Sequence, residues 1–342
     1  MKDKDSATAP ASIAPTASAA GLGLAALGVL IFSFTIPTTV FGLEGLDPYV
    51  IGVGRAAAAS VLAAIALLSV RARPPRRGQW AGMAAVCAGV VFGFPLLSTL
   101  ALDHGASSAH SAVVVGLLPA VTAVFAVLRA GERPSRAFWL ASGAGAVCVT
   151  GFAVLRGAGR VTAADLLLFA ALLAAAAGYA EGARLTRDMP GWRVISWALV
   201  LAAPITVPVT LWLLATTRPD WTGRSALGFA YLTAFSAYLG FFAWYKGLAR
   251  AGIARASQMQ LAQPVLTLLW SGILLDEVVD GTTVLAAVSV LVCVALTQRT
   301  RVRRVQDPGP LRPVTDSRTM GGAASQRRDL GGAVHGRQAD HP

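Results

Sequence analysis

The chain contains 342 residues, of which 55% are hydrophobic and 13% are charged, and its mean hydropathy is +0.61. Soluble domains carry about 25% charged residues, so this chain has too little charge to cover a water-exposed surface, and a soluble globular protein is excluded. The net charge of +12 does not indicate a nucleic-acid partner, because the basic residues gather in short loops between apolar blocks.

The apolar residues form blocks of roughly twenty, the length that crosses a ~30 Å hydrocarbon core. Lipid offers no partner to unpaired backbone groups, so spans of this length are expected to be helices and not the shorter strands of a barrel. The sequence predicts an all-α polytopic membrane protein with ten transmembrane helices, at 21–42, 49–70, 80–102, 107–128, 137–156, 162–183, 192–214, 225–247, 256–275 and 281–298.

The two ends of the chain differ from these blocks. Residues 1–20 mix charges with Ala, Ser and Pro and lack the pattern of a cleaved signal peptide. Residues 299–342 are polar and rich in Arg, Gly and Pro, so a disordered basic tail is expected.

The loop charges predict the orientation. The loops on one side of the predicted bundle carry thirteen Lys and Arg residues between positions 71 and 255, and those on the other side carry four. Basic loops face the cytoplasm. We therefore expect both termini in the cytoplasm of a multi-pass protein of the cell membrane, with the lipid bilayer as its surroundings.

Nothing in the sequence indicates a metal, a cofactor or an energy-coupling ATP site. Cys87, Cys148 and Cys293 lie within apolar spans, and no Cys/His spacing is typical of a metal site. An ATP-driven pump would need a phosphate loop with Gly-Lys-Ser/Thr, and none of the three lysines lies in one.

One segment occurs twice. "LLPAVTAVFAVLRAGE" (117–132) and "LAQPVLTLLWSGILLDE" (261–277) share Pro, Thr and Glu at a shift of 145 residues, which pairs Pro119 with Pro264, Thr122 with Thr267 and Glu132 with Glu277. Five spans, an odd number, separate each residue from its copy. The two halves are therefore expected to have opposite orientations in the membrane, as in the inverted repeats of many secondary transporters.

The segments 101–155 and 238–279, which contain these copies, resemble the second halves of two EamA domains of the drug/metabolite transporter superfamily. The resemblance covers about residues 21–298. It implies two inverted five-helix repeats, 21–156 and 162–298, with no bound cofactor. It also implies a central cavity lined mainly by helices one, three, four, six, eight and nine.

Pro119, Pro264 and the polar side chains of the ninth span are candidates for the solute path. Proline kinks a helix and frees a carbonyl, so the two prolines either shape the bundle or bend paired helices around a path. Ser257, Gln260, Pro264, Thr267 and Ser271 form one stripe, with Gln263 beside it, and a stripe of this kind faces a neighbouring helix or water.

The eighth span carries an aromatic stripe, Tyr238, Phe241, Phe242 and Tyr245, next to Trp244. Packing is one interpretation and a ligand-facing wall is the other, with Tyr238 and Trp244 as candidate contacts.

Two ionisable residues inside the spans are functional candidates, because charge in a bilayer is costly. Arg55 lies six residues into the second span and either extends to the outer headgroups or pairs with a substrate or another side chain. Glu181, near the inner end of the sixth span, either pairs with Arg184 or Lys246 or carries a proton. Arg55 and Glu181 are not expected to pair. Glu132 and Glu277 are interpreted as complements to the N-terminal ends of the helices that follow them.

The predicted function is secondary transport of a small organic solute, metabolite, amino-acid-like or drug-like, as a proton- or exchange-coupled exporter without enzymatic activity. An intramembrane enzyme and a membrane receptor or sensor are the alternatives. The sequence leaves open the substrate, the direction of transport, the coupling ion and the role of the tail. It also leaves open the oligomeric state, for which a homodimer is one option.

Overall fold

The computed structural model describes residues 19–130, 135–156, 160–251 and 259–299, and the predicted 1–20 terminus and 299–342 tail lie almost wholly outside them. Every regular element in these ranges is helical. The first repeat contains α1 (Ala19–Ser33), α2 (Thr35–Leu43), η1 (Val50–Gly54), α3 (Arg55–Ser69), η2 (Arg77–Gln79), α4 (Trp80–Val86), η3 (Cys87–Gly93), α5 (Phe94–Asp103), α6 (Ser108–Val115), α7 (Leu118–Ala130) and α8 (Arg136–Arg156).

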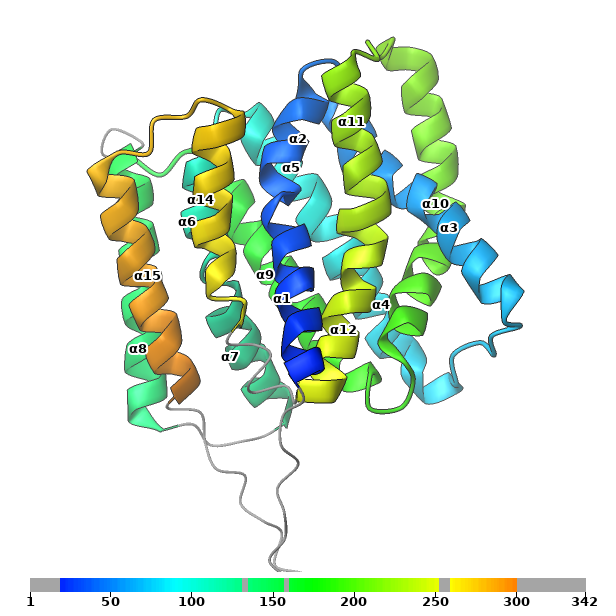
Figure 1. Ribbon diagram of the computed structural model, residues 1–342, viewed down its shortest axis with the longest axis horizontal. Helices are drawn as coiled ribbons and strands as arrows, with labels where there is room; N and C mark the ends of the chain where they lie inside the picture. Colours follow the sequence, from blue (N-terminus) through cyan, green and yellow to red (C-terminus); the bar gives the residue numbers. More distant parts are fainter. Residues whose placement is uncertain (1–18, 131–134, 157–159, 252–258, 300–342) are drawn as a thin grey trace, which may run out of the picture. The chain divides into compact units, whose positions relative to one another are not determined.

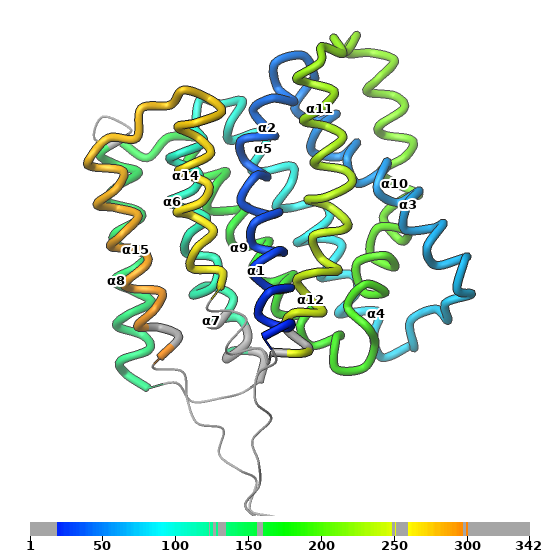
Figure 2. Tube along the Cα trace, viewed as in Figure 1, coloured from blue at the N-terminus to red at the C-terminus, as the bar shows by residue number. Residues whose placement is uncertain are grey.

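The second repeat follows the same order of spans. Its elements are α9 (Ala163–Leu185), α10 (Gly191–Thr217), α11 (Gly223–Tyr231), η4 (Leu232–Leu239), α12 (Gly240–Ala251), α14 (Ala262–Leu274) and α15 (Gly281–Arg299). Consecutive elements such as α1 and α2 form one column across the bundle (Figure 2).

Seven helical stretches are long and apolar enough to cross a membrane, and three shorter apolar helices lie at Ser108–Thr122, Ala262–Leu274 and Gly281–Leu296. The shorter three coincide with the predicted fourth, ninth and tenth spans. The protein is therefore a multi-pass membrane protein, and the count of ten spans stays a prediction.

Three of the spans contain a π-helical segment, namely η1, η3 and η4. A π-helical turn holds one more residue than an α-helical turn, so it rotates the side chains that follow it, and such turns are frequent at functional sites. The glycines in "VIGVG" and "CAGVVFG" allow close packing there: a Cβ on Gly52 would lie 2.9 Å from the Leu96 Cα.

The contacts between the repeats are arranged in matching pairs. The first span contacts the eighth through α1 and α12, and its counterpart in the second repeat, α9, contacts the third span through α4 and α5. The fourth and ninth spans meet through α6 and α14, and the fifth and tenth through α8 and α15. This is the pattern of two similar halves related by a two-fold axis.

The fourth span and its copy run in opposite directions (Figure 1). Ser271, near the end of α14, donates a hydrogen bond of 2.7 Å to Ser108, the first residue of α6. Antiparallel copies of one span are what an inverted repeat requires.

The end of the bundle opposite the start of α1 and the end of α15 carries polar contacts between the repeats. The Glu277 carboxylate accepts hydrogen bonds of 2.8 Å from the backbone N–H groups of Ser108 and Ala109. His110 Nε2 lies 2.8 Å from Asp165 Oδ1. The prediction that Glu277 complements the helix after it is thus wrong: it caps α6 of the other repeat, where unpaired N–H groups are available. Its copy Glu132 lies outside the described residues.

The outer surface of the bundle is apolar. Leu68, Leu140, Val147 and Leu285 are each at least two-thirds exposed, although they lie on helices long or apolar enough for a membrane. Large exposed apolar side chains on several helices are typical of a surface that faces lipid.

Candidate functional site

A central cavity lies between the repeats. Side chains of both repeats line it, from α1, α2, α3, η3, α5, α6 and α7 in the first and from α9, α10, η4, α12 and α14 in the second. The second and seventh spans contribute through Arg55 and Ile195, in addition to the spans that the family resemblance implied.

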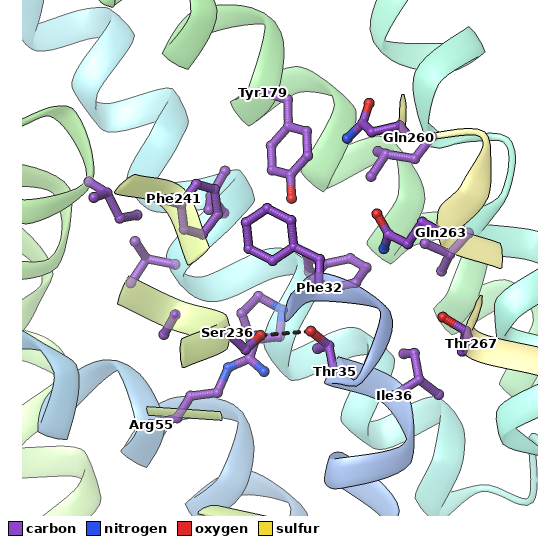
Figure 3. A pocket seen from close by; sticks show the side chains of 18 of the residues that line it. Phe32, Thr35, Ile36, Arg55, Tyr179, Ser236, Phe241, Gln260, Gln263 and Thr267 are labelled. Carbon is purple, nitrogen blue, oxygen red and sulfur yellow. Dashed lines mark hydrogen bonds between the residues drawn. The ribbon is translucent and has the colours of Figure 1, made fainter. Parts of the chain in front are cut away.

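The polar groups of the cavity lie on different sides of it (Figure 3). Gln260 and Gln263 extend from the start of the ninth span, and the Tyr179 side chain extends from α9 toward the middle. Thr35 of α2 and Ser236 of η4 share a hydrogen bond of 2.8 Å between their hydroxyl oxygens. These groups can orient a solute by hydrogen bonds from several directions.

Aromatic and aliphatic side chains form most of the remaining wall. The Phe32 and Phe241 rings have centroids 4.9 Å apart, and the Tyr179 ring meets Phe241 edge-on at 6.1 Å. Val90, Ile195 and other aliphatic residues complete the lining. A largely apolar wall with a few separated polar groups is typical of a site for a small organic molecule.

Arg55 is the one residue with a formal charge in the described lining. Its side chain is 4% exposed, and no hydrogen bond or ion pair joins it to another described residue. It begins α3 directly after η1, and Gly54 before it packs against Thr210 and Phe229. The side chain extends to the side of the cavity where Thr35 and Ser236 meet (Figure 3).

Thr267 lines the cavity and also holds the first span. Pro37 has no N–H, so the carbonyl of Ser33, four residues earlier, has no partner within its own helix. The Thr267 hydroxyl donates to this oxygen at 2.9 Å, and Trp270 Nε1 donates to the Ser33 hydroxyl at 2.9 Å. The ninth span therefore stabilises the break between α1 and α2.

Pro119 and Pro264 both line the cavity but do not lie in the middle of a helix. Pro119 is the second residue of α7, after a turn at Gly116 and Leu117, and Pro264 is the third residue of α14. Proline is tolerated in a first helical turn because its missing N–H would have no partner there. The expected interior kink is a helix start in both copies.

Tyr238 and Trp244, which the sequence placed as candidate solute contacts, do not line the cavity. The Tyr238 hydroxyl hydrogen-bonds Ser196 at 3.0 Å. Trp244 is buried where α12 meets α1, and a Cβ on Gly28 would lie 3.0 Å from its Cα. Only Phe241 of the aromatic stripe faces the cavity.

Glu181 also lies outside the cavity lining. Its carboxylate accepts a hydrogen bond of 2.8 Å from Arg184 Nε, which is one of the two partners expected from the sequence. A Cβ on Gly82 of α4 would lie 3.0 Å from this carboxylate, so the pair packs against the third span. No ion pair between Arg55 and Glu181 occurs in the described residues.

Sequence reasoning missed Tyr179, Thr35, Ser236 and Phe32. No stripe or repeat at helical spacing set them apart from the other small polar and aromatic residues of their spans. The glycines of η1 and η3 were a signal that could have located the π-helical segments. Among the residues that the structure describes, no three His, Cys, Asp or Glu side chains gather as metal ligands would.

Comparison with known proteins decides the family. The model of the EamA-like transporter family matches residues 19–154 and again 162–299. The chain belongs to the EamA-like transporter family. The transporter YdeK of Bacillus subtilis (strain 168), described as uncharacterized, is 43% identical over 276 residues, which cover 80% of this chain and 95% of the relative.

A solved crystal structure supports the fold alone. It is 18% identical to this EamA protein, with a TM-score of 0.55, and the match covers 81% of this chain and 95% of the other. Family membership and the named relative together indicate a membrane transporter of small solutes and not an enzyme.

Proposed function

We propose that this EamA protein is a secondary transporter that exports a small organic solute from the cytoplasm across the cell membrane. The observation that carries the proposal is the central cavity, which takes its lining from both repeats and combines an apolar wall with separated polar groups. A solute held between two halves can be exposed to either side when the halves rock against each other.

In this proposal both termini are cytoplasmic, as the loop charges indicate, so the polar contacts of Glu277 and His110 close the external end. Gln260 and Gln263 bind polar groups of the solute, and Thr267 positions the first span. Tyr238 and Trp244 serve in packing, and Pro119 and Pro264 set where α7 and α14 begin. Neither a cofactor nor a homodimer is required for this cycle.

The test of transport is a comparison of metabolites inside cells and in the medium, between cells that overproduce the protein and cells that lack it. We expect at least one small solute to move from cells to medium with overproduction. Gln260→Leu removes a carboxamide that is 7% exposed at the cavity, so export of that solute is expected to fall about tenfold or more, as for a buried polar group left unpaired.

Ser289→Leu is the matched control, because Ser289 is half-buried on α15, lies outside the cavity lining and bonds only to its own helix in the described contacts. It should leave export unchanged. Identical metabolite distributions in both strains would contradict transport, and chemical turnover of a solute without any gradient would favour the enzyme alternative.

Coupling to protons or to exchange is tested in liposomes with Glu181→Gln. If Glu181 carries the coupling proton, the variant loses accumulation driven by a proton gradient but keeps exchange of one solute for another. If the variant keeps both the proton-driven accumulation and the exchange, the Glu181–Arg184 pair has a packing role.

A further inference from the structure

The charge of the cavity is unbalanced. Arg55 carries a positive charge, and the described lining contains no Asp or Glu. The guanidinium has no hydrogen-bond or ion-pair partner in the described residues, although the side chain is 96% buried. A buried charge is normally paired, so an anionic group of a ligand is the partner that fits Arg55.

The backbone directly before Arg55 is closely packed. An added Cβ would lie 2.9 Å from the Leu96 Cα at Gly52, and 3.2 Å and 3.3 Å from side-chain carbons of Thr210 and Phe229 at Gly54. This packing holds the start of α3 inside the bundle, where the Arg55 side chain is buried and lines the cavity. The arrangement is a preformed site and not a flexible surface charge.

The geometry of the group selects the ligand. A guanidinium presents planar, forked N–H donors that match the two oxygens of a carboxylate or the oxygens of a sulfonate. Beyond it the cavity offers the rings of Phe32 and Phe241, and on another side the neutral groups of Gln260 and Gln263 (Figure 3). A ligand that matches the guanidinium, the rings and the neutral carboxamides has one anionic end and an apolar or aromatic body.

We propose that the transported solute is a small monovalent organic anion whose acidic group is bound by Arg55. The inference rests on the proposed transport function and names its substrate class. Arg55 repels a cation. In the described lining, a zwitterion finds no carboxylate for its ammonium group, and a divalent anion finds one cation where it needs two.

The probes are three molecules with the same ring: benzenesulfonate, benzenesulfonamide and benzyltrimethylammonium. The sulfonate keeps its charge at all working pH values, so it does not cross the lipid as a neutral acid. The purified full chain is reconstituted in liposomes, and exchange of each labelled probe is measured. Binding in detergent is measured in parallel by the shift in melting temperature.

We expect the wild type to bind and exchange benzenesulfonate and to discriminate against the other two probes about tenfold or more, the loss that an unmatched charge in a buried site produces. Arg55→Gln should lose this preference, and Arg55→Lys should keep part of it, because Lys retains the charge without the fork. Gln260→Leu should weaken binding of all three without changing their order.

The stability of Arg55→Gln separates a ligand-binding role from a structural one. Removing an unpaired buried charge should leave the melting temperature of the ligand-free protein unchanged or raise it, whereas loss of a structural contact would lower it. A lower melting temperature overturns the proposal.

Further outcomes overturn the substrate class. They are exchange of the neutral or cationic probe at the rate of the sulfonate, an anion preference that survives in Arg55→Gln, and no response to benzenesulfonate at all. In each of these the metabolite comparison in cells still reports on transport itself. Failure of the anion class and failure of the transporter function are therefore distinguishable.

Discussion

At the scale of single residues, the two copies of the repeated threonine have different environments. Thr267 donates to the Ser33 carbonyl that Pro37 leaves without a helical partner, at 2.9 Å. The hydroxyl of its copy, Thr122, is buried and has no hydrogen-bond partner in the described residues. One proline in the first span, without a counterpart in α9, explains the difference.

This asymmetry provides a matched pair of variants. Thr267→Val leaves the Ser33 carbonyl unpaired and should destabilise the protein by about 1 kcal/mol, which is a fall of a few degrees in melting temperature. Thr122→Val removes a hydroxyl that has no partner and should leave the melting temperature unchanged or raise it. Equal falls in the two variants, measured by thermal unfolding in detergent, would contradict this assignment.

The sequence identified individual cavity residues by unusual polarity in a span or by the repeated segment, which gave Pro119, Pro264 and Thr267. Arg55, Gln260 and Gln263 are costly in lipid, and the sequence alone identified them as candidates. Trp244 and Tyr238 could not be placed, because their orientation depends on the close approach of α1 to α12 at Gly28 and on the hydroxyl of Ser196, which are far away in the chain.

At the scale of elements, five of the spans that line the cavity are interrupted within the described residues. The first span breaks at Phe34, the fourth at Gly116 and Leu117, and the second, third and eighth contain η1, η3 and η4. The positions of the spans followed from their hydropathy. The π-helical segments did not follow from hydropathy, because no local period marks them and η4 contains no glycine that could have signalled it.

Glu277 connects two of these elements. Its carboxylate accepts two hydrogen bonds from the N-terminal end of α6, where a negative charge also complements the helix dipole. We expect Glu277→Ala to weaken closure at this end of the bundle and to increase access to the cavity from the external side. The assay is labelling of Val115→Cys, which replaces a lining residue, by a membrane-impermeant maleimide in a background without the native cysteines.

Glu44→Ala is the control for this experiment. Glu44 also joins the two repeats at the same end, through Arg224 at 3.2 Å, but both side chains are more than one-third exposed. Exposed ion pairs contribute about 0–1 kcal/mol. Labelling of Val115→Cys should therefore stay near the level measured with Glu44 intact. Unchanged labelling in Glu277→Ala would show that this contact does not close the bundle.

At the scale of the whole molecule, the duplicated segment predicted both the number of repeats and their opposed directions. A short stretch was enough because an odd number of spans between two copies reverses the second one. The pairing of spans one with eight, three with six, and five with ten then follows from a two-fold relation, and the cavity lies between the two halves. The shape of that cavity required the tertiary packing.

The most direct test of this account is the side of the membrane on which two equivalent positions lie. Arg136 and Gly281 begin the fifth and tenth spans and are separated by the repeat shift of 145 residues. Both are exposed, and an added Cβ on Gly281 meets no atom within 4 Å. Arg136→Cys and Gly281→Cys, each in a background without the native cysteines, are labelled with an impermeant maleimide in right-side-out and inverted vesicles. The account predicts that Gly281→Cys reacts from the outside and Arg136→Cys from the inside, and reaction of both from one side would contradict it.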